Sequence, residues 1–295
     1  MIIAVTGASG SIGKELIPFL ENEGHSIINI SSSMPSDKKS IFSYQDLIDQ
    51  SVNCHVDIFI HLASLNSNLN EANIKMEVRL TENILNSMKY LDCQKLIFFS
   101  TGKVYGDNAF ALDIFSESSE SKPSCPYSNA KKLCEDLILK RSSELDLNSI
   151  IFRMPPVINQ SDSSNLGKLM KLSHRGFLIP LFIEGNHNQR SFISFSNIKT
   201  VIKHLIDNQE FFRDSKIYNL SDEGYISLNA LLRISSKRKI LVLPQIVSNF
   251  FFKIPFFRRF LLKLYGNFVM ENTKLTRELG VKLNSTSQAL SKIYK

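Results

Sequence analysis

Three glycines follow directly on a short apolar segment at the start of this chain. Residues 2–6, IIAVT, are rich in β-branched side chains and predict a buried strand, after which come Gly7, Gly10 and Gly13. Apolar residues at helical spacing then predict a helix that ends at Gly24. Glycines in this setting permit a tight turn and a close approach of the backbone to a pyrophosphate, which the helix N-terminus attracts. The pattern predicts a dinucleotide site, and the alternative is a turn that merely requires glycine. The predicted cofactor residues of this turn are Gly7, Gly10, Ser11, Ile12 and Gly13.

Strands and helices alternate through the first half of the chain. Further buried strands are predicted at residues 27–30, 57–62, 95–100 and 149–153, with amphipathic helices at 71–90 and 127–145. Such alternation is typical of a parallel sheet with helices on both faces. We therefore predict an α/β fold, a Rossmann-type doubly wound parallel sheet with a smaller, mixed C-terminal substrate lobe. The dinucleotide-binding domain is expected at residues 1–155, with parts of 187–215 returning to it, and the substrate lobe mainly at 156–295.

The composition excludes several classes of protein. With 295 residues, 43% of them hydrophobic, the chain can bury a substantial core, which rules out a small disulfide scaffold. Cys54, Cys93, Cys125 and Cys134 form no Cys-x-x-Cys pair, and no histidine stands at zinc-ligand spacing, so we expect no metal. A basic leader and an apolar run of roughly 20 residues are both missing. We expect a cytoplasmic protein with reduced thiols and no transmembrane segment.

The formal net charge of +7 is concentrated in one segment. Residues 224–270 carry eight basic side chains and no acidic one. Because the chain has no nucleic-acid-binding motif, this segment fits an acidic small ligand, a protein partner or lipid head groups better than DNA, and a solvated face is the alternative. The Phe-rich residues 250–264 suit a membrane interface. Pro255 interrupts a long helix there, however, and packing into the core is the favoured interpretation.

A second constellation combines Thr101, Tyr127 and Lys131. Tyr127 and Lys131 stand four residues apart at the start of a predicted helix, so they lie on one face, one turn apart. A nearby ammonium favours the phenolate and should lower the tyrosine pKa from about 10 towards neutrality. Thr101 follows a predicted buried strand, at the sheet edge where such folds bind ligands. We predict that Tyr127 exchanges a proton with a substrate oxygen to which Thr101 also donates.

The end of the second strand bears on the choice of dinucleotide. An acidic residue there would bind the ribose 2′-hydroxyl of NAD. This chain has Ser31, Ser32 and Ser33 instead, with Lys38 and Lys39 beyond them. Hydroxyls and cations suit a 2′-phosphate, so the sequence favours NADP over NAD, with Ser31 and Ser32 as cofactor residues, and an ordinary polar loop as the alternative.

Taken together, the chain resembles the extended short-chain dehydrogenases/reductases of the NAD-dependent epimerase/dehydratase family, which act on nucleotide sugars. The resemblance spans essentially the whole chain. It rests on TGASGSIG at 6–13, HLAS at 61–64, STGKVYG at 100–106, PYSNAK at 126–131, FRMPPVI at 152–158, QRSFISFSNI at 189–198, YNLSDEGYIS at 218–227 and RELGVKL at 277–283. These segments are similar to the family's TGxxGxxG turn, its strand end with VYG, its YxxxK pair and its terminal LGW signature, among others.

The resemblance implies roles for single residues. Thr101 would polarise the substrate oxygen, Tyr127 would be the acid/base, and Lys131 would hold the nicotinamide ribose and tune Tyr127. Asn165 and Arg190 match positions that hold a nucleotide diphosphate, a role that suits a guanidinium, although a loop Asn and a surface Arg are also common. Further cofactor contacts are implied for Leu62, Ala63, Ser64 and Pro155. A homodimer paired through the helices at 71–90 and 127–145 is also a family-level expectation.

The chain departs from the family pattern at informative places. Glu77 stands where the family usually carries Asn, which puts any contact of that Asn in doubt. Gly102 and Lys103 follow Thr101, where a dehydratase of this family has Asp-Glu, so dehydration is disfavoured. The missing acid after the second strand favours a reductase of UDP- or dTDP-linked 4-keto-6-deoxyhexoses or N-acetylhexosamines in surface polysaccharide biosynthesis. The alternatives are a UDP-sugar 4-epimerase with tightly bound NAD and a non-catalytic NADP-sensing protein.

Overall fold

A computed structural model describes residues 1–31, 41–49, 54–64, 70–106, 114–158, 165–177, 180–237, 240–254, 261 and 265–294. The chain divides into two compact units. The first contains Met1–Gly106, Glu120–Arg153 and Lys203–Tyr218, and the second contains Asp107–Ser119, Met154–Ile202 and Asn219–Lys295. Residues 114–119 fall within the predicted dinucleotide domain but group with the second unit, because strand β6 (Ile114–Phe115) pairs with β13 (Val269–Met270).

A seven-stranded sheet forms the centre of the first unit, in the order β11-β7-β5-β4-β1-β2-β3. Neighbouring strands from β7 to β3 pair in parallel, which confirms the predicted Rossmann-type α/β fold. The short edge strand β3 was not predicted. The strands are β1 (Ile2–Thr6), β2 (Ser26–Ser31), β3 (Ile41–Ser43), β4 (Ile58–His61), β5 (Lys95–Phe99), β7 (Asn148–Arg153) and β11 (Lys216–Asn219).

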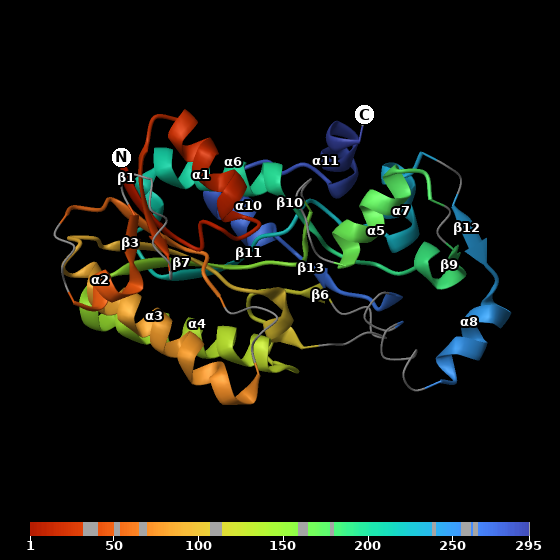
Figure 1. Ribbon diagram of the computed structural model, residues 1–295, viewed down its shortest axis with the longest axis horizontal. Coiled ribbons are helices and arrows are strands. Elements are labelled where there is room, and N and C mark those ends of the chain that lie inside the picture. Colours follow the sequence, from red (N-terminus) through yellow and green to blue (C-terminus); the bar gives the residue numbers. More distant parts are fainter. Residues whose placement is uncertain are drawn as a thin grey trace. The chain divides into compact units, whose positions relative to one another are not determined.

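Helices cover both faces of this sheet. Helix α1 (Gly13–Asn22) lies on one face, and α2 (Tyr44–Ile48), α3 (Ile74–Met88) and α4 (Pro126–Leu145) lie on the other (Figure 1). The two long helices α3 and α4 lie side by side. Their apolar stripes bury Ile84, Leu85, Met88, Cys134 and Ile138 against the inner strands. Because both helices are anchored in this core, the polar residues on their first turns are held near the carboxyl ends of the strands.

Local sequence explains where the helices begin and end. Ser43 caps α2 through a reciprocal capping box with Asp46. Pro126 occupies the first turn of α4, where its missing N–H has no cost, and Asp146 ends that helix in the left-handed conformation at φ 54°. A 3-10 turn (Glu71–Asn73) leads into α3 and another (Gly102–Tyr105) follows β5. The positions of Thr101 and Tyr127 therefore follow from well-defined ends of β5 and α4.

The second unit is built from short elements. Its three two-stranded parallel pairs are β10 with β8, β12 with β9, and β13 with β6. The remaining strands are β8 (Val157–Ile158), β9 (Pro180–Phe182), β10 (Ile193–Ser194) and β12 (Leu241–Leu243). The helices are α5 (Asn165–His174), α7 (Leu228–Ser235), α8 (Gln245–Phe252), α10 (Thr273–Leu279) and α11 (Thr286–Ile293), and α6 (Phe195–Asp207) runs from the second unit into the first.

A buried carboxylate organises the second unit. The Asp222 Oδ1 atom accepts hydrogen bonds from the backbone N–H and side chain of Ser194 and from Asn197, and Oδ2 accepts one from Thr286. Burial raises the pKa of Asp222, and these donors oppose that rise. An apolar cluster that includes Phe192, Leu231 and Leu232 fills the interior of this unit.

The Phe-rich segment at 250–264 is described only in part. Residues 255–260 and 262–264 lie outside the described residues, and so do five of the eight basic residues of the 224–270 segment. Within the described part, α8 exposes Ile246 and Phe250, at 83% and 64%. Among the helices that the structure describes, none combines the length and the apolar character that crossing a membrane requires.

Candidate active site

The turn between β1 and α1 needs glycine at two of its positions. Gly7 has φ +76°, and a Cβ atom there would lie 2.7 Å from the backbone nitrogen of Ala63. A Cβ atom on Gly13 would lie 2.4 Å from the Gly7 carbonyl oxygen. The Gly10 N–H donates to the same carbonyl at 2.9 Å, which closes the turn. A side chain at either position would collide with neighbouring backbone atoms, so glycine is required here for the turn to pack against the end of β4 and the start of α1.

The end of β4 lies against this turn. The predicted cofactor residues Leu62, Ala63 and Ser64 follow this strand directly, and the Ala63 N–H donates to Thr6 Oγ1 at 3.3 Å. Thr6 Oγ1 also lies 2.8 Å from Nδ1 of the buried His61. Burial, and secondarily the charge of Lys131, hold the pKa of His61 well below its ordinary value. His61 is therefore a neutral, packed residue at the strand end.

Thr101 and Tyr127 meet beyond the end of β5. Thr101 is buried and accepts a hydrogen bond from the backbone N–H of Lys103 at 3.3 Å. The half-buried Tyr127 stands in the first turn of α4, and the Thr101 side chain is close enough to its phenol to lower the pKa of Tyr127. The Lys103 ammonium lies 5.9 Å from the centre of the Tyr127 ring. The two hydroxyl-bearing side chains therefore lie near one another beyond the carboxyl end of β5.

Lys131 lies one turn further along α4 and is almost fully buried. Its Nζ is 3.3 Å from Oε1 of Glu77 on α3, and each of these side chains is 2% exposed. The ammonium also lies 4.6 Å from the centre of the Phe98 ring on β5. The Glu77 carboxylate partners this buried ammonium, and Lys131 lies close enough to Tyr127 for its charge to lower the pKa of that phenol.

The pKa of Tyr127 differs from the prediction. The sequence predicted that Lys131 lowers it towards neutrality, whereas the structure has it raised above its ordinary value of 10. Burial is the largest cause; Lys131 lowers it, the charges of Glu77 and Cys125 raise it, and the bond with Thr101 lowers it. The correction has two physical sources, because the sequence pattern showed neither how deeply the phenol is buried nor that a carboxylate accompanies the ammonium.

Tyr44 is a neighbour of the site that the sequence did not reveal. It stands in the first turn of α2, and its hydroxyl is hydrogen-bonded to Thr6. Burial first, and then the Glu77 carboxylate, raise its pKa to about 12. The Ser43–Asp46 capping pattern could have located the start of this helix, but nothing local indicates that Tyr44 turns towards the ends of β1 and β4.

Three further residues predicted to contact the cofactor belong to the first unit: Ser11, Ile12 and Ser31. Ser11 and Ile12 complete the glycine turn, and Ser31 ends β2 opposite Ser43. Ser32, with Lys38 and Lys39, lies outside the described residues, so of the residues predicted to meet a 2′-phosphate the structure describes Ser31.

Pro155, Asn165 and Arg190 belong to the second unit. Pro155 is buried just after β7. Asn165 is the first residue of α5, and its side chain lies outside the described part of the structure. Arg190 is half-buried, and its Nη1 donates to the backbone carbonyl of Gly266 at 2.8 Å.

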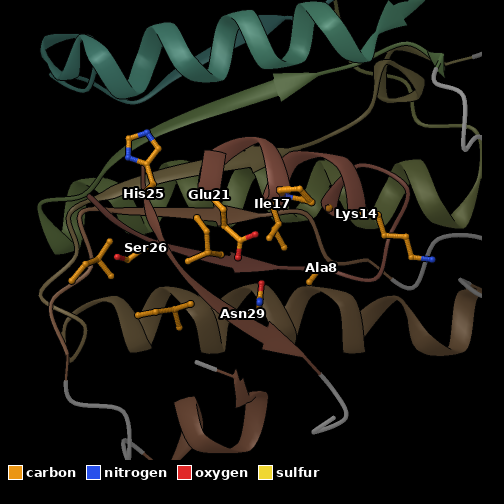
Figure 2. Close-up of a pocket in the computed structure, with 12 residues that line it drawn as sticks. Ala8, Lys14, Ile17, Glu21, His25, Ser26 and Asn29 are labelled. Atoms are coloured by element: carbon orange, nitrogen blue, oxygen red, sulfur yellow. The ribbon is translucent and has the colours of Figure 1, made fainter. Parts of the chain in front are cut away.

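An open pocket runs along α1 and β2 in the first unit (Figure 2), with a volume of about 690 Å³. It reaches the glycine turn at Ala8 and Gly13, and Lys14 and Asn29 line it further along. Thr101, Tyr127 and Lys131 do not line it. Across the described residues, no group of three or more His, Cys, Asp or Glu side chains is arranged to hold a metal ion.

Comparisons with known proteins agree with this geometry. Residues 3–221 match the model of a family described as "NAD dependent epimerase/dehydratase family". A dTDP-glucose 4,6-dehydratase of Haemophilus influenzae is 28% identical over 215 residues, which cover 62% of this chain and 60% of that protein. A GDP-6-deoxy-D-talose 4-dehydrogenase of Aggregatibacter actinomycetemcomitans is 28% identical over 207 residues, which cover 68% and 64%. The chain therefore spans less than two thirds of the length of both relatives.

A solved structure shows the same fold over nearly all of both chains. The UDP-N-acetylglucosamine 4-epimerase from Bacillus cereus superposes with a TM-score of 0.77 and covers 100% of this chain and 98% of its own. The two sequences are 18% identical. At this identity the likeness shows the fold alone, so the chemistry has to be argued from this chain's own residues.

Proposed function

Because this chain belongs to the NAD-dependent epimerase/dehydratase family, we propose that it is an NAD(P)-dependent oxidoreductase that acts at C4 of a nucleotide sugar. The more specific proposal is reduction of the 4-keto group of a UDP- or dTDP-linked 6-deoxyhexose or N-acetylhexosamine in surface polysaccharide biosynthesis. One observation carries it: Thr101, Tyr127 and Lys131 gather at one end of the sheet, in the same unit as the glycine turn.

The residues of the site divide the work of such a reduction. A bound nicotinamide ring supplies the hydride that reaches C4 of the sugar. Tyr127 gives its phenolic proton to the C4 oxygen, and Thr101 donates a hydrogen bond to the same oxygen and orients it. The Lys131 ammonium stabilises the phenolate that remains. Tyr127 is protonated at neutral pH, as a proton donor must be, and its raised pKa makes stabilisation of the phenolate by Lys131 the more important for the transfer.

The glycine turn fits the pyrophosphate of the cofactor, and Ser31 supports NADP over NAD because β2 ends in a hydroxyl rather than a carboxylate. Gly7→Ala tests this site. The new methyl group would meet the Ala63 nitrogen at 2.7 Å, so we expect NADPH affinity to fall by at least about tenfold.

Gly24→Ala is the matched control for Gly7→Ala. Gly24 also has positive φ, at +86°, but its Cβ would meet nothing within 4 Å. It should therefore reproduce the backbone strain, about 1 kcal/mol, and leave cofactor affinity unchanged. Equal affinity in both variants would remove the turn from the cofactor site. Titrations with NADH alongside NADPH decide between the two cofactors.

Two other functions compete with the reductase. A UDP-sugar 4-epimerase with tightly bound NAD would use the same tyrosine and cofactor to oxidise C4 and return the hydride. The relative named a 4-dehydrogenase supports a single oxidation or reduction at position 4 instead. Dehydration is disfavoured because the turn after Thr101, Gly102–Tyr105, contains no carboxylate. A non-catalytic NADP-sensing protein is the least supported, because Tyr127 and Lys131 are both retained.

Substrate binding by the second unit rests on Arg190 and Asn165. A guanidinium can bind two oxygens of a nucleotide diphosphate at once, and Arg190 is oriented by its bond to the Gly266 carbonyl. Asn165 would add a neutral contact from the start of α5. We propose these two residues as diphosphate ligands.

The purified protein can be tested directly for the reaction. We expect it to be isolated without stoichiometric nicotinamide and to oxidise NADPH in the presence of a 4-keto sugar, in a screen of UDP- and dTDP-linked 4-keto and 4-hydroxy sugars. NAD retained through purification, together with interconversion of 4-hydroxy sugars, would replace the reductase by the epimerase. Failure of every sugar, with reversible NADPH binding, would favour the sensor.

We also propose a homodimer formed through α3 and α4. Met76 on α3 and Leu133 on α4 are 62% and 42% exposed on the helix pair that covers one face of the sheet. Light scattering should give twice the mass of the chain, and a double substitution of Met76 and Leu133 by Glu should halve it.

A further inference from the structure

A buried carboxylate lies next to the proposed active-site lysine. Glu77 Oε1 is 3.3 Å from Lys131 Nζ, and both side chains are 2% exposed. Exclusion of water leaves such a pair poorly screened, so it acts strongly on neighbouring groups. Glu77 comes from α3 and Lys131 from α4, and the pair therefore also fixes the ammonium relative to the other residues on α4.

The groups around this ion pair are neutral near pH 7. His61 on β4 has a pKa well below its ordinary value because it is buried. Burial raises the pKa of Tyr44 on α2 to about 12 and that of Cys134 on α4 to about 11. On the β5 side, the centre of the Phe98 ring lies 4.6 Å from the Lys131 ammonium. Within this described cluster, the charges are those of the pair itself.

Other charged groups lie at the edges of the cluster. Lys103 faces the Tyr127 ring at 5.9 Å, and Cys125 precedes α4. Glu135, one turn beyond Lys131, is bound to Arg153. Lys103 and Cys125 are present in every variant considered below, and Glu135 is changed only in the control, so these groups do not affect the comparison of Glu77→Gln with the unaltered protein.

We propose that Glu77 is a positioning residue that holds the Lys131 ammonium beside Tyr127 and offsets part of its charge at the phenol. This inference rests on the proposed function, in which Tyr127 is the proton donor. The carboxylate is the anionic partner of the Lys131 ammonium where both side chains are 2% exposed. It also makes the phenol hold its proton more firmly than the ammonium alone would allow, which keeps Tyr127 protonated before the transfer at the cost of a weaker acid.

The sign of the effect follows from charge alone. An anion nearby favours the protonated form of both Lys131 and Tyr127. Replacing Glu77 by the neutral Gln therefore makes this lysine–tyrosine pair release its first proton at lower pH, whichever residue loses it. We expect a downward shift of about one pH unit for a charge this close.

The measurement is a pH titration of the protein labelled with carbon-13 at tyrosine Cζ. The chain has 8 tyrosines, and the Tyr127 resonance is the one that disappears in Tyr127→Phe. In Glu77→Gln its first midpoint should fall by about one unit, and the pH profile of kcat/KM should move in the same direction. An unchanged midpoint would overturn the inference.

Glu135→Gln is the matched control. It removes a carboxylate from another buried ion pair, where Glu135 and Arg153 are 0% and 4% exposed. It should destabilise the fold but leave the Tyr127 midpoint where it is. If both substitutions lower the melting temperature and neither moves the midpoint, Glu77 has a structural role only, and the inference is wrong.

A second comparison holds even if Glu77→Gln does not fold. The double variant Glu77→Gln/Lys131→Gln leaves no unpaired charge in the site, and it is compared with Lys131→Gln. At the alkaline pH where the phenol titrates Glu77 is ionised, so its removal should again lower the Tyr127 midpoint, and equal midpoints would contradict the inference. Failure of the proposed function looks different, because Tyr127→Phe would then keep its turnover while the midpoints still shifted.

Discussion

Lys131 and Glu135 lie one turn apart on α4, and each belongs to a buried ion pair. The two pairs differ in the geometry of the contact between their charged groups. Glu135 accepts hydrogen bonds from Arg153 Nε at 3.2 and 3.1 Å and from Nη2 at 2.7 Å, and also from Ser100 Oγ at 2.5 Å. Lys131 and Glu77 make a looser contact at 3.3 Å. The first pair is a bidentate clamp of a planar guanidinium, and the second joins a point charge to one carboxylate oxygen.

From this difference we infer a structural role for the Glu135–Arg153 pair and a role in the reaction for the Lys131–Glu77 pair. The Glu135–Arg153 pair ties α4 to the end of β7, and its cation also packs 4.9 Å from the Tyr105 ring. An ammonium has three donors, so Lys131 can hold Glu77 and still turn a donor towards another acceptor near Tyr127. We infer that the Glu135–Arg153 pair holds α4 against the end of β7. The Lys131–Glu77 pair, one turn away on α4, then acts on Tyr127.

The largest expected effect tests the chemistry of the looser pair. Tyr127→Phe removes the acid while retaining the ring, so kcat should fall by about 10³-fold with NADPH affinity unchanged. Steady-state kinetics and a fluorescence titration of NADPH measure the two quantities. Normal turnover in the variant would show that the acid lies elsewhere and that the two ion pairs do not differ in function.

The next effect tests the clamp. Glu135→Gln leaves the Arg153 guanidinium buried without its anion and should lower the free energy of unfolding by about 3–5 kcal/mol in urea denaturation. Asp136→Asn is the control from the next position on α4, because Asp136 is 55% exposed in its pair with Lys132 and should change stability by less than about 1 kcal/mol. Equal losses in the two variants would refute the supporting role of the clamp.

A pH dependence of stability should follow from His61, the neutral neighbour of the looser pair. Its pKa in the fold is well below the ordinary 6.5, so below that pH the unfolded chain binds a proton that the folded chain does not. Stability should therefore fall as the pH drops below 6.5, by up to about 1.4 kcal/mol per pH unit from this residue. Urea denaturation at several pH values, with His61→Gln, measures the slope.

His55 provides a control of opposite sign for that measurement. Asp92 and Asp57 raise its pKa, so its contribution to stability is present at low pH and is lost as the pH rises through its folded pKa. His55→Gln should remove a loss of stability that occurs as the pH rises above 6.5 and leave the slope below pH 6.5 unchanged, whereas His61→Gln should make the slope below pH 6.5 shallower. The same slope in both variants would contradict the neutral state of His61.

The smallest expected effect concerns Arg190, whose guanidinium donates to the backbone carbonyl of Gly266 rather than to a carboxylate. Arg190→Ala should raise the KM for a nucleotide sugar by about tenfold with kcat nearly unchanged, because a charged hydrogen bond to the diphosphate is lost. Arg233→Ala, which removes an exposed side chain bound to Asn186, is the control. An unchanged KM in Arg190→Ala would exclude Arg190 from the diphosphate site.

Much of the first unit could be predicted because its signals are local. Short apolar runs and turn residues indicate the strand at 2–6, the glycines after it and the other buried strands of the sheet. The predicted ends of these strands agree with the structure within one or two residues. The second unit offered weaker signals, because strands such as β8 and β10 have two residues each. No periodicity is detectable at that length, and pairing between distant segments defines them instead.

The sequence alone determined the turn that needs glycine and the spacing of Tyr127 and Lys131, since both depend on backbone geometry over a few residues. The tertiary structure decided how those groups are charged. Glu77 appeared in the sequence as a departure from a pattern, and only the packing of α3 on α4 brings it to Lys131. The same packing buries the phenol and raises its pKa where the spacing had predicted a fall. The physical reason is that burial and charge pairing depend on neighbours distant in the chain, which no local pattern specifies.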